Sequence, residues 1–136
     1  MAKSKVEKVN KTITGMELKY ETILVYLLSF LGLIFAFMKN EKVSSDARFH
    51  YKQSGAAFLV YLGVSIIESI LGAIAFAFAF SPLFIVSVLF TIVTSVIGLV
   101  SLAVFILSII AVIKAFNDER FEIPVVNNIA NAIWKE

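Results

Sequence analysis

Glu68 is the acidic side chain with the clearest potential for chemistry inside a membrane. It lies in an apolar run from Ser54 to Phe116, where the only charged side chains are Glu68 and Lys114. Because a carboxylate is costly in hydrocarbon, we expect Glu68 to face the protein interior or to be protonated. Two interpretations stay open: a proton or cation position along a pathway, or a hydrogen-bonded packing contact between helices.

Small and hydroxylated residues recur around Glu68 at helical spacing, and they continue in the next apolar segment. They are Tyr61, Ser65, Gly72, Ala75 and Ala79, then Ser87, Thr91, Thr94, Gly98, Ser101 and Ser108. In lipid, such residues let helices approach closely and hydrogen-bond across the contact. Counting outward from Ser81 places Glu68 opposite Thr94 and Ser95. The sequence therefore predicts an intramembrane polar site of Glu68, Ser65, Thr94 and Ser95.

Residues for a catalytic or metal centre are sparse. The chain has no cysteine and a single histidine, His50, which excludes cysteine-ligated and multi-histidine metal sites. A histidine base also needs a nucleophile and an orienting partner, and no glycine-rich phosphate loop occurs. We expect a non-enzymatic protein without cofactor or metal, in which His50 contacts lipid headgroups.

Long apolar helices must position Glu68. The 136 residues are 60% hydrophobic and only 16% charged, with a mean hydropathy of +0.92, whereas soluble domains are about a quarter charged. A net charge of +2 gives no indication of a nucleic-acid partner. The composition predicts one all-α, multi-pass membrane domain. Its expected partners are the lipid bilayer and either other membrane helices or further copies of the chain.

Changes in polarity divide residues 1–136 into six segments. They are an interfacial N-terminal segment (1–20), a first span (22–38), a polar connection (39–53), a second span (54–80), a third span (82–116) and an amphipathic C-terminal segment (117–136). Short amphipathic interfacial helices are expected at both ends. Ser81-Pro82 is typical of a helix N-cap followed by proline at the first helical position, and it predicts a tight hairpin.

The number of spans stays open between three and four. The stretch from Leu83 to Ile113 would extend ~46 Å as one helix, well beyond one bilayer core. It is either one long helix that tilts or projects, or two crossings with a turn near Gly98. Two crossings would have about 15 residues each, which is short for a span, so we favour three. The lysine and arginine counts leave the sidedness of the termini undetermined.

Two stretches resemble motifs of a family of small prokaryotic membrane proteins. Residues 46–53 are similar to its Arg-Phe-His-x-Lys-Gln junction, and residues 113–124 are similar to its closing segment, I-x-A-x-x-G-x-x-F-x-x-P. The family comprises bacterial and archaeal relatives of the twenty-kilodalton channel subunit of the chloroplast inner-envelope import translocon. The resemblance covers about residues 22–133. The matching interface residues are Arg48, Phe49, His50, Lys52, Gln53 and Pro124.

This resemblance implies an all-helical inner-membrane protein associated with polypeptide translocation or a larger membrane complex. The chain departs from the family pattern in two places. Its second and third apolar stretches are longer, which keeps a four-span topology open. It also lacks the glycine after Phe116, where we expect Asn117-Asp118 to make the turn.

Three functions follow from these patterns. The leading hypothesis is a non-enzymatic component of, or accessory to, a membrane complex, with protein translocation as the implied process. The alternative is a small oligomeric channel or proton-coupled transporter that uses Glu68. A membrane-embedded immunity or stress protein is the third, and it rests on size alone.

Overall fold

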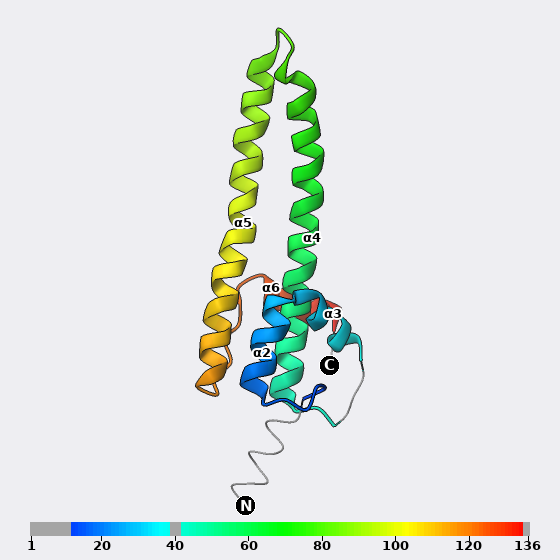
Figure 1. Ribbon diagram of the computed structural model, residues 1–136, viewed down its shortest axis with the longest axis vertical. Helices are drawn as coiled ribbons and strands as arrows, with labels where there is room; N and C mark the ends of the chain where they lie inside the picture. The colour runs from blue at the N-terminus through cyan, green and yellow to red at the C-terminus, as the bar shows by residue number, and fades with distance from the viewer. Residues whose placement is uncertain (1–11, 39–41, 135–136) are drawn as a thin grey trace, which may run out of the picture. The chain divides into compact units, whose positions relative to one another are not determined.

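The computed structural model describes residues 12–38 and 42–134, and the regular structure within them is helical throughout (Figure 1). The helices are α2 (Leu18–Leu27), α3 (Ser29–Phe37), α4 (Ser45–Ala79), α5 (Phe84–Phe116) and α6 (Val126–Ile133). The prediction of an all-α fold is confirmed. The chain groups into two compact units, the first drawn from Met1–Phe58 and Ile106–Glu136 and the second from Leu59–Phe105.

Two helices, α4 with 35 residues and α5 with 33, are long and apolar enough to cross a membrane. They cover nearly all of the second and third predicted spans, 54–80 and 82–116. α5 continues without interruption through Gly98, so the four-span alternative, which required a turn there, is wrong. A glycine costs a helix only about 1 kcal/mol relative to alanine, whereas each backbone group exposed to lipid by a break costs several.

The first predicted span, 22–38, is broken into two helices. α2 and α3 meet at Leu28 with a bend of 113°, because the φ of −109° and ψ of 72° at Leu28 leave the helical region. Within residues 12–38 and 42–134, two helices could therefore span a membrane by length and composition, or three if the bent pair forms one span. The prediction of three long transmembrane helices is not confirmed, because a bend within an apolar segment cannot be predicted from its composition.

The bend places α3 where it crosses α4 at two glycines of the first unit. A Cβ added to Gly32 would lie 1.8 Å from the Ser54 Oγ and 3.0 Å from the backbone nitrogen of Gly55. A Cβ added to Gly55 would lie 2.8 Å from the Cα of Leu33. The two backbones are therefore in contact, and only glycine at both positions allows them to approach this closely.

The chain after α5 turns sharply before α6. Asp118 has a φ of 57°, and the Glu119 N–H donates to the Lys114 carbonyl at 2.9 Å. Aspartate tolerates this left-handed conformation better than most residues, so the predicted turn at Asn117-Asp118 is confirmed.

α6 buries Val126 and Ala130 on one face, as expected for the amphipathic C-terminal helix. The predicted helix at the other end falls largely on residues 1–11, which lie outside the described residues. Residues 12–17 are not helical.

The second unit is a hairpin of the adjoining parts of α4 and α5. The chain turns at Ser81 as predicted, and the Ser81 Oγ accepts from the Leu83 N–H at 3.1 Å. The predicted N-cap at Ser81 with proline at the first helical position is wrong, because α5 begins only at Phe84. Of the small residues predicted for the inner face of α5, Ser87, Thr94, Gly98 and Ser101 are partly buried, whereas Thr91 is exposed.

The inner face of α4 differs from the prediction. Tyr61, Glu68 and Ala75 face inward as expected, but Ser65, Gly72 and Ala79 are exposed. Val64, Leu71 and Phe78 take the inward places instead.

Replacing Gly55 by alanine tests the glycine contact. Gly55→Ala is expected to destabilise the protein by about 1–3 kcal/mol, because backbone must move to accept the methyl group. Gly63→Ala is the matched control, since a Cβ there meets nothing within 4 Å and alanine favours the helix. Thermal unfolding of both variants in detergent micelles measures the difference. Equal melting temperatures would contradict a backbone contact at Gly55.

Candidate functional site

The first nine residues of α4 include most of the interface residues singled out in the sequence, and these residues lie on two faces of the helix. His50 and Gln53 are buried, together with Tyr51. Arg48, Phe49 and Lys52 are only partly buried and line a pocket. The helical repeat of 3.6 residues accounts for this division. One end of α4 therefore contributes both a buried polar network and a basic surface.

Gln53 connects α4 to the chain after α5 through its side-chain amide. Its Nε2 donates to the Phe121 carbonyl at 2.9 Å, and its Oε1 accepts from the Ile123 N–H at 2.8 Å. Residues 121–123 are non-helical, as expected for the chain before Pro124. The Gln53 amide thus supplies the hydrogen bonds that this non-helical backbone would otherwise need from a neighbouring strand or helix turn.

The same amide extends the network to α2. The Gln53 Nε2 donates its second hydrogen to the Tyr26 hydroxyl at 2.7 Å, and the Tyr26 oxygen lies 3.1 Å from the His50 Nδ1. If Tyr26 donates its own proton to Nδ1, the imidazole carries its proton on Nε2. The expected contact of His50 with lipid headgroups is not found, because its ring is buried among these residues.

A second buried cluster surrounds Glu21, which has no exposed surface. Its carboxylate accepts from the Tyr51 hydroxyl and from the Thr14 N–H at 2.9 Å and Thr14 hydroxyl. Tyr51 in turn accepts from the Ile13 N–H at 3.0 Å. Several donors thus satisfy the buried carboxylate, and they tie residues 12–17 to α2 and α4.

Arg120 is held at the exposed edge of the first unit by three neighbours. Its Nε donates to Asp46, a terminal nitrogen donates to the Ser45 hydroxyl at 3.0 Å, and its guanidinium lies 5.3 Å from the centre of the Phe49 ring. Two of its five N–H groups are used in these hydrogen bonds.

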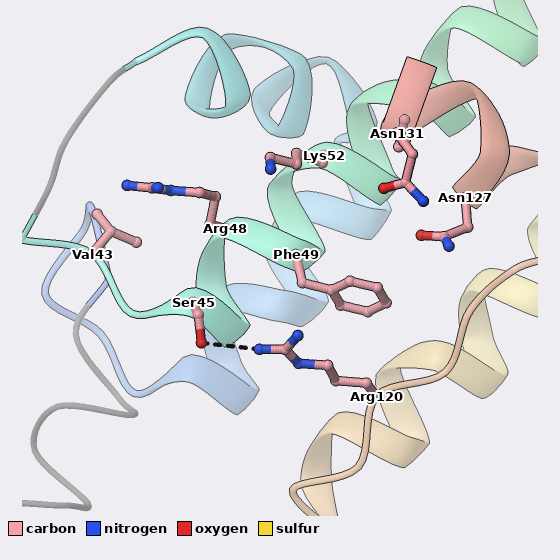
Figure 2. A pocket seen from close by; sticks show the side chains of 9 residues that line it. Val43, Ser45, Arg48, Phe49, Lys52, Arg120, Asn127 and Asn131 are labelled. Atoms are coloured by element: carbon pink, nitrogen blue, oxygen red, sulfur yellow. Dashed lines mark hydrogen bonds between the residues drawn. The ribbon is translucent and has the colours of Figure 1, made fainter. Parts of the chain in front are cut away.

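A pocket of about 420 Å³ opens beside Arg120 (Figure 2). Arg48, Phe49 and Lys52 come from successive turns of α4, Arg120 comes from the chain before α6, and Asn127 and Asn131 come from α6. Its lining is completed by Val43, Ser45 and Ala130. The nine lining residues that the structure describes include three cations and two carboxamides.

The predicted intramembrane site lies separately, in the second unit, and its members are only partly together. Glu68 packs against Gly98, where an added Cβ would be 2.7 Å from the Glu68 Oε1. Thr94 and Ser95 donate instead to carbonyls of their own helix, those of Phe90 at 2.8 Å and Thr91 at 2.9 Å. Ser65 faces outward.

The offset from Thr94 to Gly98 has a simple geometric cause. Side chains lean toward the N-terminus of their helix, so the Glu68 carboxylate extends away from the hairpin turn. It therefore meets α5 about one turn beyond the position that counting along the backbone predicts.

Several residues that form the buried networks and the pocket of the first unit were not predicted from the sequence. Tyr26, Glu21 and Arg120 lie far from residues 48–53 in the chain, and Asn127 and Asn131 belong to no motif. Glu21 alone carried a usable signal, because it is an acidic side chain at the start of an apolar segment. Among the described residues, no group of three histidine, cysteine or acidic side chains could hold a metal ion.

Two archaeal proteins from Methanocaldococcus jannaschii are similar to this chain over most of its length. UPF0132 membrane protein MJ1527 is 32% identical over 128 residues, which cover 90% of this chain and 74% of that protein. UPF0132 membrane protein MJ1443 is 31% identical over 123 residues, which cover 90% of this chain and 93% of that protein. Neither name assigns an activity or a substrate. No family model matches the chain, and no solved structure gives a significant match.

Replacing Gln53 by leucine tests the amide bridge. Gln53→Leu keeps a similar volume but leaves the Ile123 N–H and the Phe121 carbonyl without their partner, so we expect a loss of about 2–4 kcal/mol in stability. Limited proteolysis should also cut residues 117–125 faster. Glu122→Ala is the control, because that side chain is exposed between the two bonded backbone groups. Identical cleavage of the Gln53→Leu and Glu122→Ala proteins would show that the amide does not hold the segment.

Proposed function

The chain belongs to the UPF0132 family of membrane proteins, and from that premise we propose that it is a non-enzymatic component of a membrane complex. In this proposal the outward face of α4 binds a helix of another subunit. The protein acts by packing and not by catalysis. It is a multi-pass protein of the cell (inner) membrane.

The observation that carries this proposal is a stripe of small residues on the outward face of α4. Ser65, Ser69 and Gly72 are all exposed, and a Cβ on Gly72 would meet nothing within 4 Å. The Ser69 hydroxyl donates to the Ser65 carbonyl at 2.7 Å, so its hydrogen is satisfied within the helix. In lipid, association between helices depends on such close backbone approach. This face is therefore suited to a partner helix.

The resemblance to prokaryotic relatives of the chloroplast import translocon supplies a class of complex. We propose that the partner helix belongs to an assembly that handles polypeptides at the membrane. This assignment rests on residues 46–53 and 113–124 by analogy.

A second candidate function is proton or cation transfer through Glu68. It is supported by the place of the Glu68 carboxylate on the inner face of the hairpin, against Gly98, in a stretch of sequence without another charged residue between Lys52 and Lys114. Intramembrane ionisable residues commonly mark ion pathways. One hairpin encloses little space, so this function would require several copies of the chain.

Replacing Gly72 by leucine tests the partner helix. Gly72→Leu is expected to abolish crosslinks between this chain and a partner in native membranes, because the larger side chain blocks backbone approach. Gly63→Leu is a matched control, since Gly63 has equally open surroundings but lies on another side of α4. The crosslinked partner is identified by mass spectrometry. Loss of crosslinks in both variants, or in neither, would contradict the assignment of this face.

Replacing Glu68 by glutamine tests the transport alternative. In proteoliposomes with an internal pH-sensitive dye, transport through Glu68 predicts proton flux by the unmodified protein and loss of that flux in Glu68→Gln. Glu122→Gln, an exposed acid outside the hairpin, is expected to leave the flux unchanged. A flux that persists in Glu68→Gln, or that is absent from the unmodified protein, would count against this function.

A further inference from the structure

The two short helices α2 and α3 have apolar outward faces and polar groups on their inward side. The outward residues, each at least 39% exposed, are Tyr20, Ile23, Leu27, Phe30, Ile34 and Phe37. Glu21, Thr22 and Tyr26 are buried instead. Water would favour the opposite arrangement, with the polar residues outside. An exposed apolar surface of this kind marks contact with a membrane or with another protein.

We propose that this α2–α3 surface inserts into the cytoplasmic leaflet of the cell membrane, where acyl chains cover it. In this arrangement α2 and α3 enter the leaflet and return to the same side. Among the described helices, only α4 and α5 cross the membrane. The proposal concerns the first unit, and it depends neither on the partner helix at Gly72 nor on transport through Glu68.

Both ends of the bent pair lie beside the chain that ends α5 and forms α6. The rings of Tyr20, near the start of α2, and Phe116, the last residue of α5, have centres 6.3 Å apart. Phe37, the last residue of α3, lies 5.3 Å from Trp134, which directly follows α6. The eight residues of α6 extend only ~12 Å, too short to cross a hydrocarbon core of ~30 Å. Phe116 and Trp134 therefore lie on one side of the membrane, and both ends of the pair lie there with them.

The contacts of the pair with α4 also stay at one level of that helix (Figure 1). Glu21 hydrogen-bonds to Tyr51, the ring of Phe35 lies 5.2 Å from the same Tyr51, and Gly32 lies against Ser54. A straight helix from residue 21 to residue 35 would rise ~21 Å, whereas residues 51 to 54 rise only ~5 Å along α4. The pair therefore remains next to the polar residues with which α4 begins.

The positions of the lysine and arginine residues favour two crossings and indicate the side. The sequence has twelve of them, and none lies between Lys52 and Lys114. With α4 and α5 as the crossings, all twelve lie on one side and the turn at Ser81 has none. A third crossing by residues 22–38 would divide them five against seven. Lysine and arginine gather on the cytoplasmic side, and acidic residues contribute little to this rule. The assignment of the side rests on the cell-membrane location proposed above.

Single cysteines test the number of crossings, since the chain has no cysteine of its own. Met16→Cys and Val43→Cys mark the chain before and after the bent pair, Ser81→Cys marks the hairpin turn, and Asn128→Cys marks α6. Spheroplasts that contain the full chain are treated with a membrane-impermeant maleimide, either intact or after disruption. We expect Ser81→Cys to be labelled in intact spheroplasts, and the other three variants to be labelled only after disruption.

Each other labelling pattern contradicts the proposal. A third crossing would place Met16→Cys on the same side as Ser81→Cys and opposite Val43→Cys, which would overturn the return of α2 and α3 to one side. Labelling of Val43→Cys or Asn128→Cys in intact spheroplasts, or protection of Ser81→Cys there, would overturn the cytoplasmic side.

Spin labels test the lipid contact and remain informative if a sidedness variant fails to fold. Nitroxides are attached to Phe30→Cys and Ile34→Cys, and to Ile67→Cys, an exposed position in the middle of the apolar part of α4. In proteoliposomes, oxygen should collide with all three labels more often than a water-soluble nickel chelate does. The two α3 labels should lie ~5–10 Å deep, as for other surface-inserted helices, and the label on α4 ~15 Å deep, at the centre of the core.

The same measurement identifies any other occupant of the surface. Equal depths for the Ile34→Cys and Ile67→Cys labels would overturn insertion into one leaflet. Low collision rates with both reagents at Phe30→Cys and Ile34→Cys would show that protein covers the surface, and frequent collisions with the nickel chelate would show water there. Either result would overturn the lipid contact.

Discussion

The side-chain amide of Gln53 has to satisfy buried polar groups from two other parts of the chain, and the arrangement of the first unit around it depends on that requirement. Its hydrogens go to Tyr26 and to the Phe121 carbonyl, and its oxygen accepts from the Ile123 N–H. A buried backbone group without a partner costs about 1–3 kcal/mol. The residues around 26, 53 and 121–123 therefore form one structure, because none can move away without leaving such a group unpaired.

The same constraint connects the buried network to the basic pocket. Arg120 directly precedes Phe121, so the hydrogen bond from Gln53 to the Phe121 carbonyl also limits where the guanidinium can lie. On the opposite face of α4, Arg48 and Lys52 are positioned by the helix that buries His50 and Tyr51. A polar core that is fully hydrogen-bonded is rigid. The pocket thus has a defined shape although its own side chains are long and partly exposed.

The second unit follows a different rule, because lipid replaces water as the solvent of a spanning hairpin. Large apolar residues such as Ile70, Phe76 and Leu99 are exposed, which a bilayer accommodates at no cost. Hydrophobicity then cannot distinguish an inner face from an outer face. This explains why Ser65 and Gly72, which share the seven-residue rhythm of Glu68, lie outside while Val64 and Leu71 lie inside.

The sequence by itself determined the all-helical fold, the two long apolar helices, the hairpin at Ser81 and the turn at Asp118. Each of these follows from residues that are close together in the chain: apolar length, a serine that accepts a hydrogen bond within the turn, and an aspartate that accepts a positive φ. The tertiary structure alone decided the 113° bend at Leu28, the burial of His50, and the place of Arg48 and Arg120 in the lining of one pocket. These features depend on contacts between segments that are far apart in the chain, such as the contact of Gly32 with Gly55. The free energies of such contacts cannot be predicted from a local sequence pattern.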